Sequence, residues 1–280
     1  MIEPVLSDDA FLADVRRAAG DPSAVHLWWL GQSGYLVQWR GKHLLVDPYL
    51  SDSLTKKYAG TDKPHVRMTR QVIDPARLDF IDLVTSSHAH TDHLDPDTLR
   101  PLFAVNPSLR LLAPEANRAL SAERAGINPQ AVLGIDEGQS VEAAGFSITA
   151  VASAHEAIER DEAGHSKHLG YVFRMGRLSL YHSGDTVRYA GMAGRLRELD
   201  VGAAILPING ALPERRVPGN LSGPEAARLA KDIGARVVIP CHYEMFEFNT
   251  ASPKPFVEEC RRLGQLFVVP RAGERWTLSS

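Results

Sequence analysis

A dense group of metal-type side chains lies in the run Thr-Ser-Ser-His-Ala-His-Thr-Asp-His, residues 85–93. It brings His88, His90, Asp92 and His93 within six residues of one another. Imidazole and carboxylate are ligands that zinc, manganese and iron accept in proteins. A solvated polar loop is the weaker interpretation of such density. In a loop, His88 and His90 can point one way while Asp92 and His93 turn another, so this run predicts ligands for two adjacent ions.

Three other apolar runs also end at a side chain of the metal-ligand type. The runs are 146–152, 178–182 and 237–240, and the side chains that follow them are His155, Asp185 and His242. Singly, a histidine or aspartate after a strand is more often a structural or turn residue. Together with the first run, four such strand ends predict one shared site at one edge of the core.

The elements that must position these residues alternate between strand and helix. Runs at 25–30, 35–40 and 43–46 are strand-like, and Gly41-Lys42 predicts a hairpin between the last two. Residues 47–77 lack clear periodicity, which predicts a long loop of the kind that often carries function. A helix is predicted before these strands, at 8–19. After residue 78 the pattern predicts strands and helices in alternation. The strands are at 80–85, 109–113, 170–174, 203–207 and 266–269, and the helices are at 114–125, at 222–233, from Asp95, and from Ser252 to near Gly264.

The motif His-Ala-His-Thr-Asp-His resembles the HxHxDH motif of the metallo-β-lactamase superfamily, and His155, Asp185 and His242 match its remaining ligands in order. Further segments resemble the L-ascorbate-6-phosphate lactonase (UlaG-type) branch. These segments are Trp-Trp-Leu-Gly at 28–31, Leu-Tyr-His-Ser-Gly-Asp at 180–185, Pro-Ile-Asn-Gly at 207–210 and Ala-Arg-Val-Val-Ile-Pro at 235–240. The resemblance extends over residues 25–270 and implies an α/β chain folded as a four-layer αββα sandwich.

The resemblance also implies how the ligands divide between two divalent ions, zinc or manganese, with iron as a further candidate. One ion would be held by His88, His90 and His155. The other would be held by Asp92, His93 and His242, with Asp185 bridging both. Two such ions can share a water and hold it as hydroxide near neutral pH. Asp92 is then the expected catalytic residue, which orients the nucleophile first and accepts its proton second.

The leading hypothesis is therefore a metal-dependent hydrolase that acts on a lactone or related ester of a small, anionic metabolite. A phosphodiesterase or nuclease using the same ions is the alternative among enzymes, and a thioesterase is a weaker one. From another class, a non-catalytic metal-binding scaffold stays open. For substrate contacts the candidates are His168, Asn209, Arg215 and Arg216. A guanidinium suits phosphate or carboxylate, although a solvated surface loop explains the two arginines equally well.

Composition limits the remaining classes. The chain has 280 residues, 44% of them hydrophobic, which suffices for one α/β domain over 1–280 with a helical extension at 1–24. A net charge of −3 gives no basic excess for a nucleic-acid partner. Two cysteines make a disulfide framework improbable, and no secretory signal or membrane-length apolar run is visible. We expect a cytoplasmic protein with a small-molecule substrate and no membrane partner; a homo-oligomer stays open.

Overall fold

Two seven-stranded sheets form the centre of the computed structural model, which describes residues 1–279. The predicted domain therefore ends one residue beyond the described part. The first sheet has the order β14-β1-β2-β3-β4-β5-β6. Its strands are β1 (Val25–Gly31), β2 (Gly34–Trp39), β3 (Lys42–Val46), β4 (Leu83–Thr85), β5 (Arg110–Pro114), β6 (Val132–Ile135) and β14 (Arg275–Leu278).

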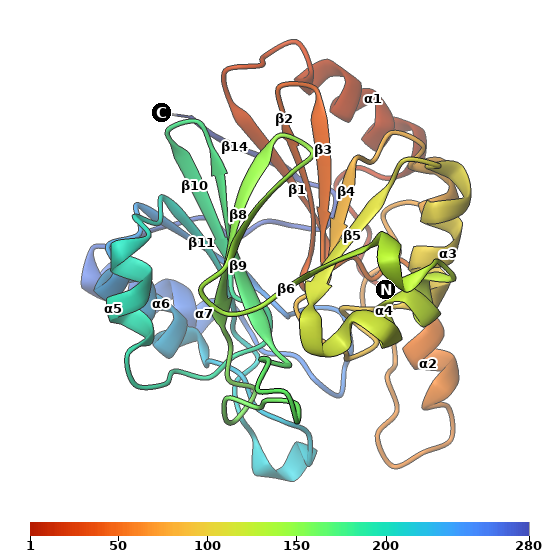
Figure 1. Ribbon diagram of the computed structural model, residues 1–280. Helices are drawn as coiled ribbons and strands as arrows, with labels where there is room; N and C mark the ends of the chain where they lie inside the picture. The colour runs from red at the N-terminus through yellow and green to blue at the C-terminus, as the bar shows by residue number, and fades with distance from the viewer. Residues whose placement is uncertain (280) are drawn as a thin grey trace.

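The second sheet repeats this plan with the order β13-β12-β11-β10-β9-β8-β7. Its strands are β7 (Ser140–Ala143), β8 (Phe146–Ala152), β9 (Leu169–Met175), β10 (Leu178–His182), β11 (Ala203–Pro207), β12 (Val237–Cys241) and β13 (Leu266–Phe267). In each sheet an antiparallel part continues into a parallel part. The two sheets face each other across the core (Figure 1).

Helices cover the outer faces of the two sheets, which gives the predicted four-layer αββα sandwich (Figure 1). The helices are α1 (Asp8–Ala18), α2 (Ser53–Lys57), α3 (Pro96–Val105), α4 (Arg118–Ala125), α5 (Met192–Glu198), α6 (Gly223–Ile233) and α7 (Lys254–Leu263). Figure 1 shows α3 and α4 outside the first sheet and α5, α6 and α7 outside the second. Among residues 1–279, no helix has the length and apolar character needed to span a membrane.

Large side chains fill the space between the sheets. Trp29 and Tyr35 from the first sheet and Tyr171 and Phe173 from the second are at most 1% exposed. Burying a side chain of phenylalanine size contributes roughly 1.5–3 kcal/mol relative to leaving it in water. This packing fixes the strand ends, and with them any side chain placed just beyond a strand.

Strand direction explains why the predicted site residues meet. In the first sheet β1, β3 and β4 run the same way, because β2 is antiparallel to both of its neighbours and β3 is parallel to β4. In the second sheet β8, β10, β11 and β12 also share one direction. The carboxyl ends of these strands therefore lie along one edge of each sheet, and the loops that follow them can converge.

The predicted helix boundaries hold where capping signals are strong. Asp95 accepts a hydrogen bond from the backbone N–H of Asp97 at the start of α3, and Ser222 forms a capping box with Glu225 at the start of α6. Helices α4, α6 and α7 end at a glycine with positive φ.

Several predicted elements differ in length or went unpredicted. The expected helix at 114–125 begins only at Arg118, because residues 115–117 form a 3-10 turn. The expected strand at 80–85 is reduced to β4. Strands β6, β7 and β14 and helices α2 and α5 were not predicted, since each is short and carries polar or glycine residues that obscure its periodicity.

Candidate metal centre

Two groups of possible metal ligands lie side by side at the shared edge of the sheets. In the first group, one ligand atom from each of His88, His90, His155 and Asp185 lies within 4.8 Å of all the others. Asp92, His93 and His242 form a second group by the same measure. The structure thus brings together all seven side chains that the sequence singled out, from four loops far apart along the chain.

Asp185 contacts members of both groups. Its Oδ2 atom lies 3.7 Å from Nε2 of His155 and 3.3 Å from Nε2 of His242, while Oδ1 lies 3.3 Å from Nε2 of His93. Nε2 of His242 also lies 3.5 Å from Oδ2 of Asp92. Two ligands of one tetrahedral zinc ion, each about 2.0–2.1 Å from the metal, are roughly 3.3 Å apart. These separations therefore suit atoms that share an ion.

Buried polar atoms without a hydrogen-bond partner also indicate that the cluster binds metal. Nε2 of His88, Nε2 of His93 and Oδ1 of Asp185 are buried and have no hydrogen-bond partner among residues 1–279. Buried polar atoms nearly always have a partner, because an unpaired one loses its hydration without compensation. Imidazole nitrogen and carboxylate oxygen are the donors of zinc, manganese and iron sites. The residues present therefore fit bound divalent metal.

The pKa shifts indicate that the second group of ligands favours positive charge. Burial disfavours a charged imidazole, but Asp185 and Asp92 outweigh that effect and raise the pKa of His242 to about 9. The same carboxylates raise the pKa of His93 well above its usual range. In turn, His93 and His242 overcome burial and lower the pKa of both carboxyl groups. Cations at this position would take over the role of the protons.

Asp47 fixes the orientation of His93. Its Oδ2 atom lies 2.7 Å from Nδ1 of His93, and both side chains are 0% exposed. Asp47 also accepts hydrogen bonds from the backbone N–H and the hydroxyl of Ser87. Because a carboxylate only accepts, Nδ1 of His93 carries the proton and Nε2 is left to face the cluster.

Backbone and amide groups orient two more members of the cluster. Nδ1 of His155 lies 2.9 Å from the carbonyl oxygen of Gly219, which also only accepts, so Nε2 of His155 is left for a metal. Gln32, directly after β1, donates from Nε2 to Oδ2 of Asp92 at 2.8 Å. These contacts reduce the freedom of the ligands before any metal binds.

A glycine allows the two sheets to approach at the site. A Cβ atom added to Gly184 would lie 2.6 Å from Cβ of Ser87, a contact that real side chains do not make. Gly184 also has a φ of +59°, which disfavours other residues. Ser87 precedes His88 and Gly184 precedes Asp185, so this contact sets the distance between two loops of the cluster.

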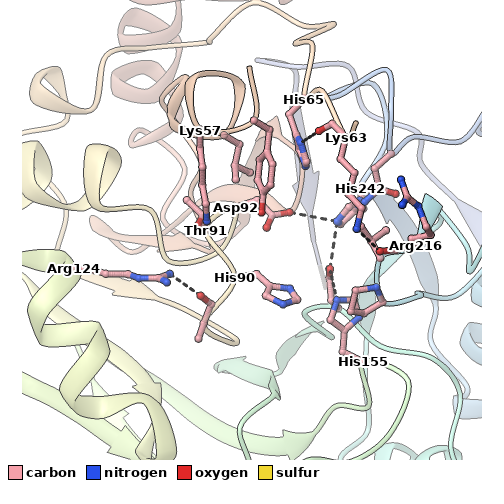
Figure 2. A pocket seen from close by; sticks show the side chains of 17 residues that line it. Lys57, Lys63, His65, His90, Thr91, Asp92, Arg124, His155, Arg216 and His242 are labelled. Atoms are coloured by element: carbon pink, nitrogen blue, oxygen red, sulfur yellow. Dashed lines mark hydrogen bonds and ion pairs between the residues drawn. The ribbon is translucent and has the colours of Figure 1, made fainter. Parts of the chain in front are cut away.

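The cluster opens into a cavity of about 380 Å³ (Figure 2). Figure 2 shows His90, Asp92, His155 and His242 directed toward its interior. The other charged or imidazole-bearing residues of its lining are Lys57, Lys63, His65, Arg124, Asp185 and Arg216. A cavity of this size can hold a small molecule.

The four predicted substrate-contact residues occupy different surroundings. The ring of His168 lies 5.0 Å from that of His88 and 5.8 Å from that of His155, between centroids. Burial and the neighbouring imidazoles lower the pKa of His168 to about 4, so it is neutral near pH 7. Arg216 lines the cavity and forms an ion pair with Asp62 at 2.5 Å.

Asn209 and Arg215, like His168, lie outside the cavity lining in the described part of the chain. The guanidinium of Arg215 donates to the carbonyl oxygens of Asn209 and Thr250. The Asn209 amide donates to Asn249, which itself lines the cavity. These two predicted residues therefore brace the loops behind the cavity wall.

Sequence reasoning missed the supporting residues. Asp47 and Gln32 each follow a strand of the first sheet, which is the same signal that identified the ligands, but one polar residue after a strand usually marks a turn. Lys57, Lys63 and His65 come from the region 47–77, which was predicted only as a loop of functional type.

Comparison with known proteins agrees with this geometry. A family model described as a beta-lactamase superfamily domain matches residues 42–243. A UPF0173 metal-dependent hydrolase of Methanoregula boonei is 30% identical over 251 residues, covering 87% of this chain and 93% of the relative. Another, from Saccharolobus solfataricus, is 25% identical and covers 90% of this chain and 99% of the relative.

Solved structures show the same fold. A metallo hydrolase of Ignicoccus hospitalis superposes with a TM-score of 0.67 at 23% identity, covering 92% of this chain and 99% of that one. An isothiocyanate hydrolase from Delia radicum gut bacteria superposes with a TM-score of 0.73 at 18% identity, covering 91% and 99%. The matching family model and the 30% identical relative show that the chain belongs to the beta-lactamase superfamily, in the family of the UPF0173 metal-dependent hydrolases.

Proposed function

We propose that this chain is a dinuclear metal-dependent hydrolase that opens a lactone or related ester of a small metabolite. The observation that carries the proposal is the position of Asp185, whose Oδ2 atom contacts His155 of the first group and His242 of the second, while Oδ1 contacts His93. A carboxylate between two complete groups of ligands is suited to bridge two ions.

In this proposal His88, His90 and His155 hold one ion, and Asp92, His93 and His242 hold the other. Zinc and manganese are the leading candidates for the metal, and iron is a third. When bound, such a pair supplies a hydroxide nucleophile near neutral pH and polarises the bond to be cleaved. Carbonyl and phosphoryl centres are both susceptible to this chemistry.

Asp92 is the proposed catalytic residue of the chain itself. Its side chain lines the cavity, and Nε2 of Gln32 donates a hydrogen bond to its Oδ2 atom at 2.8 Å. A carboxylate fixed in this way can orient an attacking water before it accepts a proton. His168 lies outside the cavity lining, but its ring is 5.0 Å from that of His88, and we keep it as a proposed substrate contact beside the first group of ligands.

The lactone or ester class is supported by the resemblance to the L-ascorbate-6-phosphate lactonase branch and by the size of the cavity. About 380 Å³ suits a metabolite. One observation favours a phosphodiesterase as the second candidate: Lys57, Lys63, Arg124 and Arg216 all line the cavity, and cations stabilise a phosphoryl transition state.

A substrate panel with metal analysis tests the proposal. Purified protein loaded with zinc or manganese is assayed against lactones, carboxylic esters, phosphodiesters and thioesters. We expect lactone or ester turnover that is lost in Asp185→Asn together with bound metal. His165→Ala is the matched control, because His165 is half-buried in a loop and pairs with Asp161 away from the cluster. Turnover of phosphodiesters alone would favour the second candidate, and a metal-loaded protein without turnover would favour a scaffold.

A further inference from the structure

The cavity wall carries more positive charge than the metal cluster requires. Four cationic side chains line the cavity: Lys57, Lys63, Arg124 and Arg216. Within residues 1–279, the only carboxylates in that lining are Asp92 and Asp185, and both belong to the two groups of ligands. If metal occupies those groups, no acidic side chain of the lining is left to balance the cations.

Two loops from different sheets supply three of these cations. Lys57 ends helix α2 and Lys63 follows it, while Arg216 lies in the loop after β11. The loops touch each other, because Nζ of Lys63 donates to the carbonyl oxygen of Arg216 at 2.6 Å and Arg216 pairs with Asp62. Figure 2 shows Lys63 and Arg216 close to His242. The contact places both loops over the cluster.

These three cations differ in whether a carboxylate of the chain neutralises them. Arg216 is already neutralised by Asp62. Lys63 donates to an uncharged carbonyl group, and among residues 1–279 Lys57 has no carboxylate within ion-pair distance. The ammonium of Lys57 lies 5.2 Å from the centre of the Tyr58 ring, which leaves its donors available. Lys57 is exposed, and Lys63 is half-buried.

We infer that the cavity selects a substrate bearing a carboxylate or phosphate group, and that Lys57 and Lys63 bind this group while the bond to be cleaved lies at the metal cluster. The inference rests on the proposed hydrolase function, whose substrate class it narrows. Opposite charges in a confined cavity attract strongly, and both lysines line the same cavity. Arg124 instead holds the metal-binding loop, because it donates to the carbonyl oxygens of Ala89 and Leu94.

The test compares matched substrates in the metal-loaded protein. The probes are a neutral sugar lactone, its phosphate ester and its carboxylate analogue, and the readout is the ratio of kcat/KM between each anionic probe and the neutral one. We expect the anionic probes to be preferred, with Lys57→Gln lowering the ratio about tenfold, mainly through KM. Lys56→Gln is the control, because Lys56 is its exposed neighbour and lies outside the lining of this cavity.

The two anionic probes show which group the lysines bind. A larger loss in Lys57→Gln for the phosphate ester identifies phosphate, and a larger loss for the carboxylate identifies carboxylate. The inference is overturned if the wild type prefers the neutral lactone and Lys57→Gln has the same ratio of kcat/KM between anionic and neutral probes. That result leaves the hydrolase proposal intact.

A binding experiment separates this inference from the proposed function. Sulfate is titrated calorimetrically into metal-loaded wild type, Lys57→Gln and Lys56→Gln at low ionic strength. Weaker binding only in Lys57→Gln supports the anion site even if none of the lactones is hydrolysed, an outcome that would contradict the proposed function alone. Equal sulfate affinity in all three proteins overturns the anion site.

Discussion

Asp47 and His93 form a fully buried pair at the centre of the site, with Oδ2 of Asp47 2.7 Å from Nδ1 of His93. The carboxylate also binds Ser87, so it joins the end of β3 to the loop that follows β4. It touches none of the other six proposed ligands in the described structure through an ion pair or hydrogen bond, yet it decides which nitrogen of His93 faces the cluster.

Replacing Asp47 by asparagine should weaken metal binding without removing a ligand. The amide cannot accept from Nδ1 of His93 and from Ser87 as the carboxylate does, so His93 loses its fixed tautomer and orientation. Partners of this kind typically contribute a factor of about 10–100 in metal affinity. Competition with a chromophoric chelator measures the change.

Asp82→Asn is the matched control for that variant. Asp82 lies close to the opposite end of β3, where it contacts Lys42 and His43 away from the cluster. We expect its metal affinity to equal that of the wild type. Equal affinity in Asp47→Asn and the wild type would contradict the role assigned to Asp47.

The close approach of Gly184 and Ser87 predicts a large effect from one methyl group. Gly184→Ala places a Cβ 2.6 Å from that of Ser87, and the residue must also keep a positive φ. We expect a loss of roughly 1–3 kcal/mol in the free energy of unfolding, together with weaker metal binding, because the loops carrying His88 and Asp185 must separate.

Thermal unfolding compares this variant with Gly194→Ala. Gly194 lies in α5, and a Cβ added there would meet nothing within 4 Å. Alanine favours the helix, so this control should be as stable as the wild type or slightly more stable. A Gly184→Ala protein with the melting temperature of the wild type would show that the two loops tolerate more separation than we infer.

Removing metal should lower stability as well as activity. A metal that binds only the folded chain stabilises it by about 2.7 kcal/mol when its free concentration is a hundred times Kd. The orphaned nitrogens of His88 and His93 and the orphaned oxygen of Asp185 would lose their partner on chelation. We expect a lower Tm after chelation and dialysis, restored by zinc or manganese but not by magnesium, which prefers oxygen ligands. An unchanged Tm would oppose a structural contribution from metal.

A carboxylate far from the site predicts acid sensitivity. Glu259 of α7 is bonded by Arg262 and by Arg228 of α6, at 2.7 and 2.6 Å. The hydrogen bond from Arg262, followed by that from Arg228, lowers the pKa of Glu259 to about 2 from an ordinary 4.5. Since the folded-state pKa is the lower one, the stabilisation is present above about pH 4.5 and is lost as the pH falls toward 2.

Urea unfolding of Glu259→Gln across this range measures the effect. The variant should be less stable than wild type near neutral pH, and the difference should shrink as the pH falls from about 4.5. Glu258→Gln is the control, because Glu258 is exposed and pairs with Lys254 at 3.9 Å. A stability difference that does not change with pH would show that Glu259 acts through packing instead.

Much of the site could be predicted because its ligands follow rigid strands. His88, His155, Asp185 and His242 each come shortly after an apolar run, and four such coincidences point to one edge of the core. The αββα layers followed from the alternation of strands and helices and from the resemblance. Physical reasons also explain what was missed. Strand β14 pairs with β1 from the other end of the chain, and local periodicity does not carry such long-range pairing.

The residues of the cavity wall could not be predicted from the sequence for a similar reason. The positions of Lys57 and Lys63 depend on how the loop after β3 packs against the loop after β11. Arg215 and Arg216 are adjacent and chemically identical, yet one braces the loops and the other lines the cavity. Neighbouring side chains in an irregular loop diverge according to backbone direction, which no residue pattern specifies.

Anomalous diffraction from crystals of the zinc- or manganese-loaded protein tests the central claim most directly. The account predicts two anomalous peaks per chain, one among His88, His90 and His155 and the other among Asp92, His93 and His242, with the Asp185 carboxylate between them. A single peak, or peaks that leave Asp185 without a metal on either side, would contradict it.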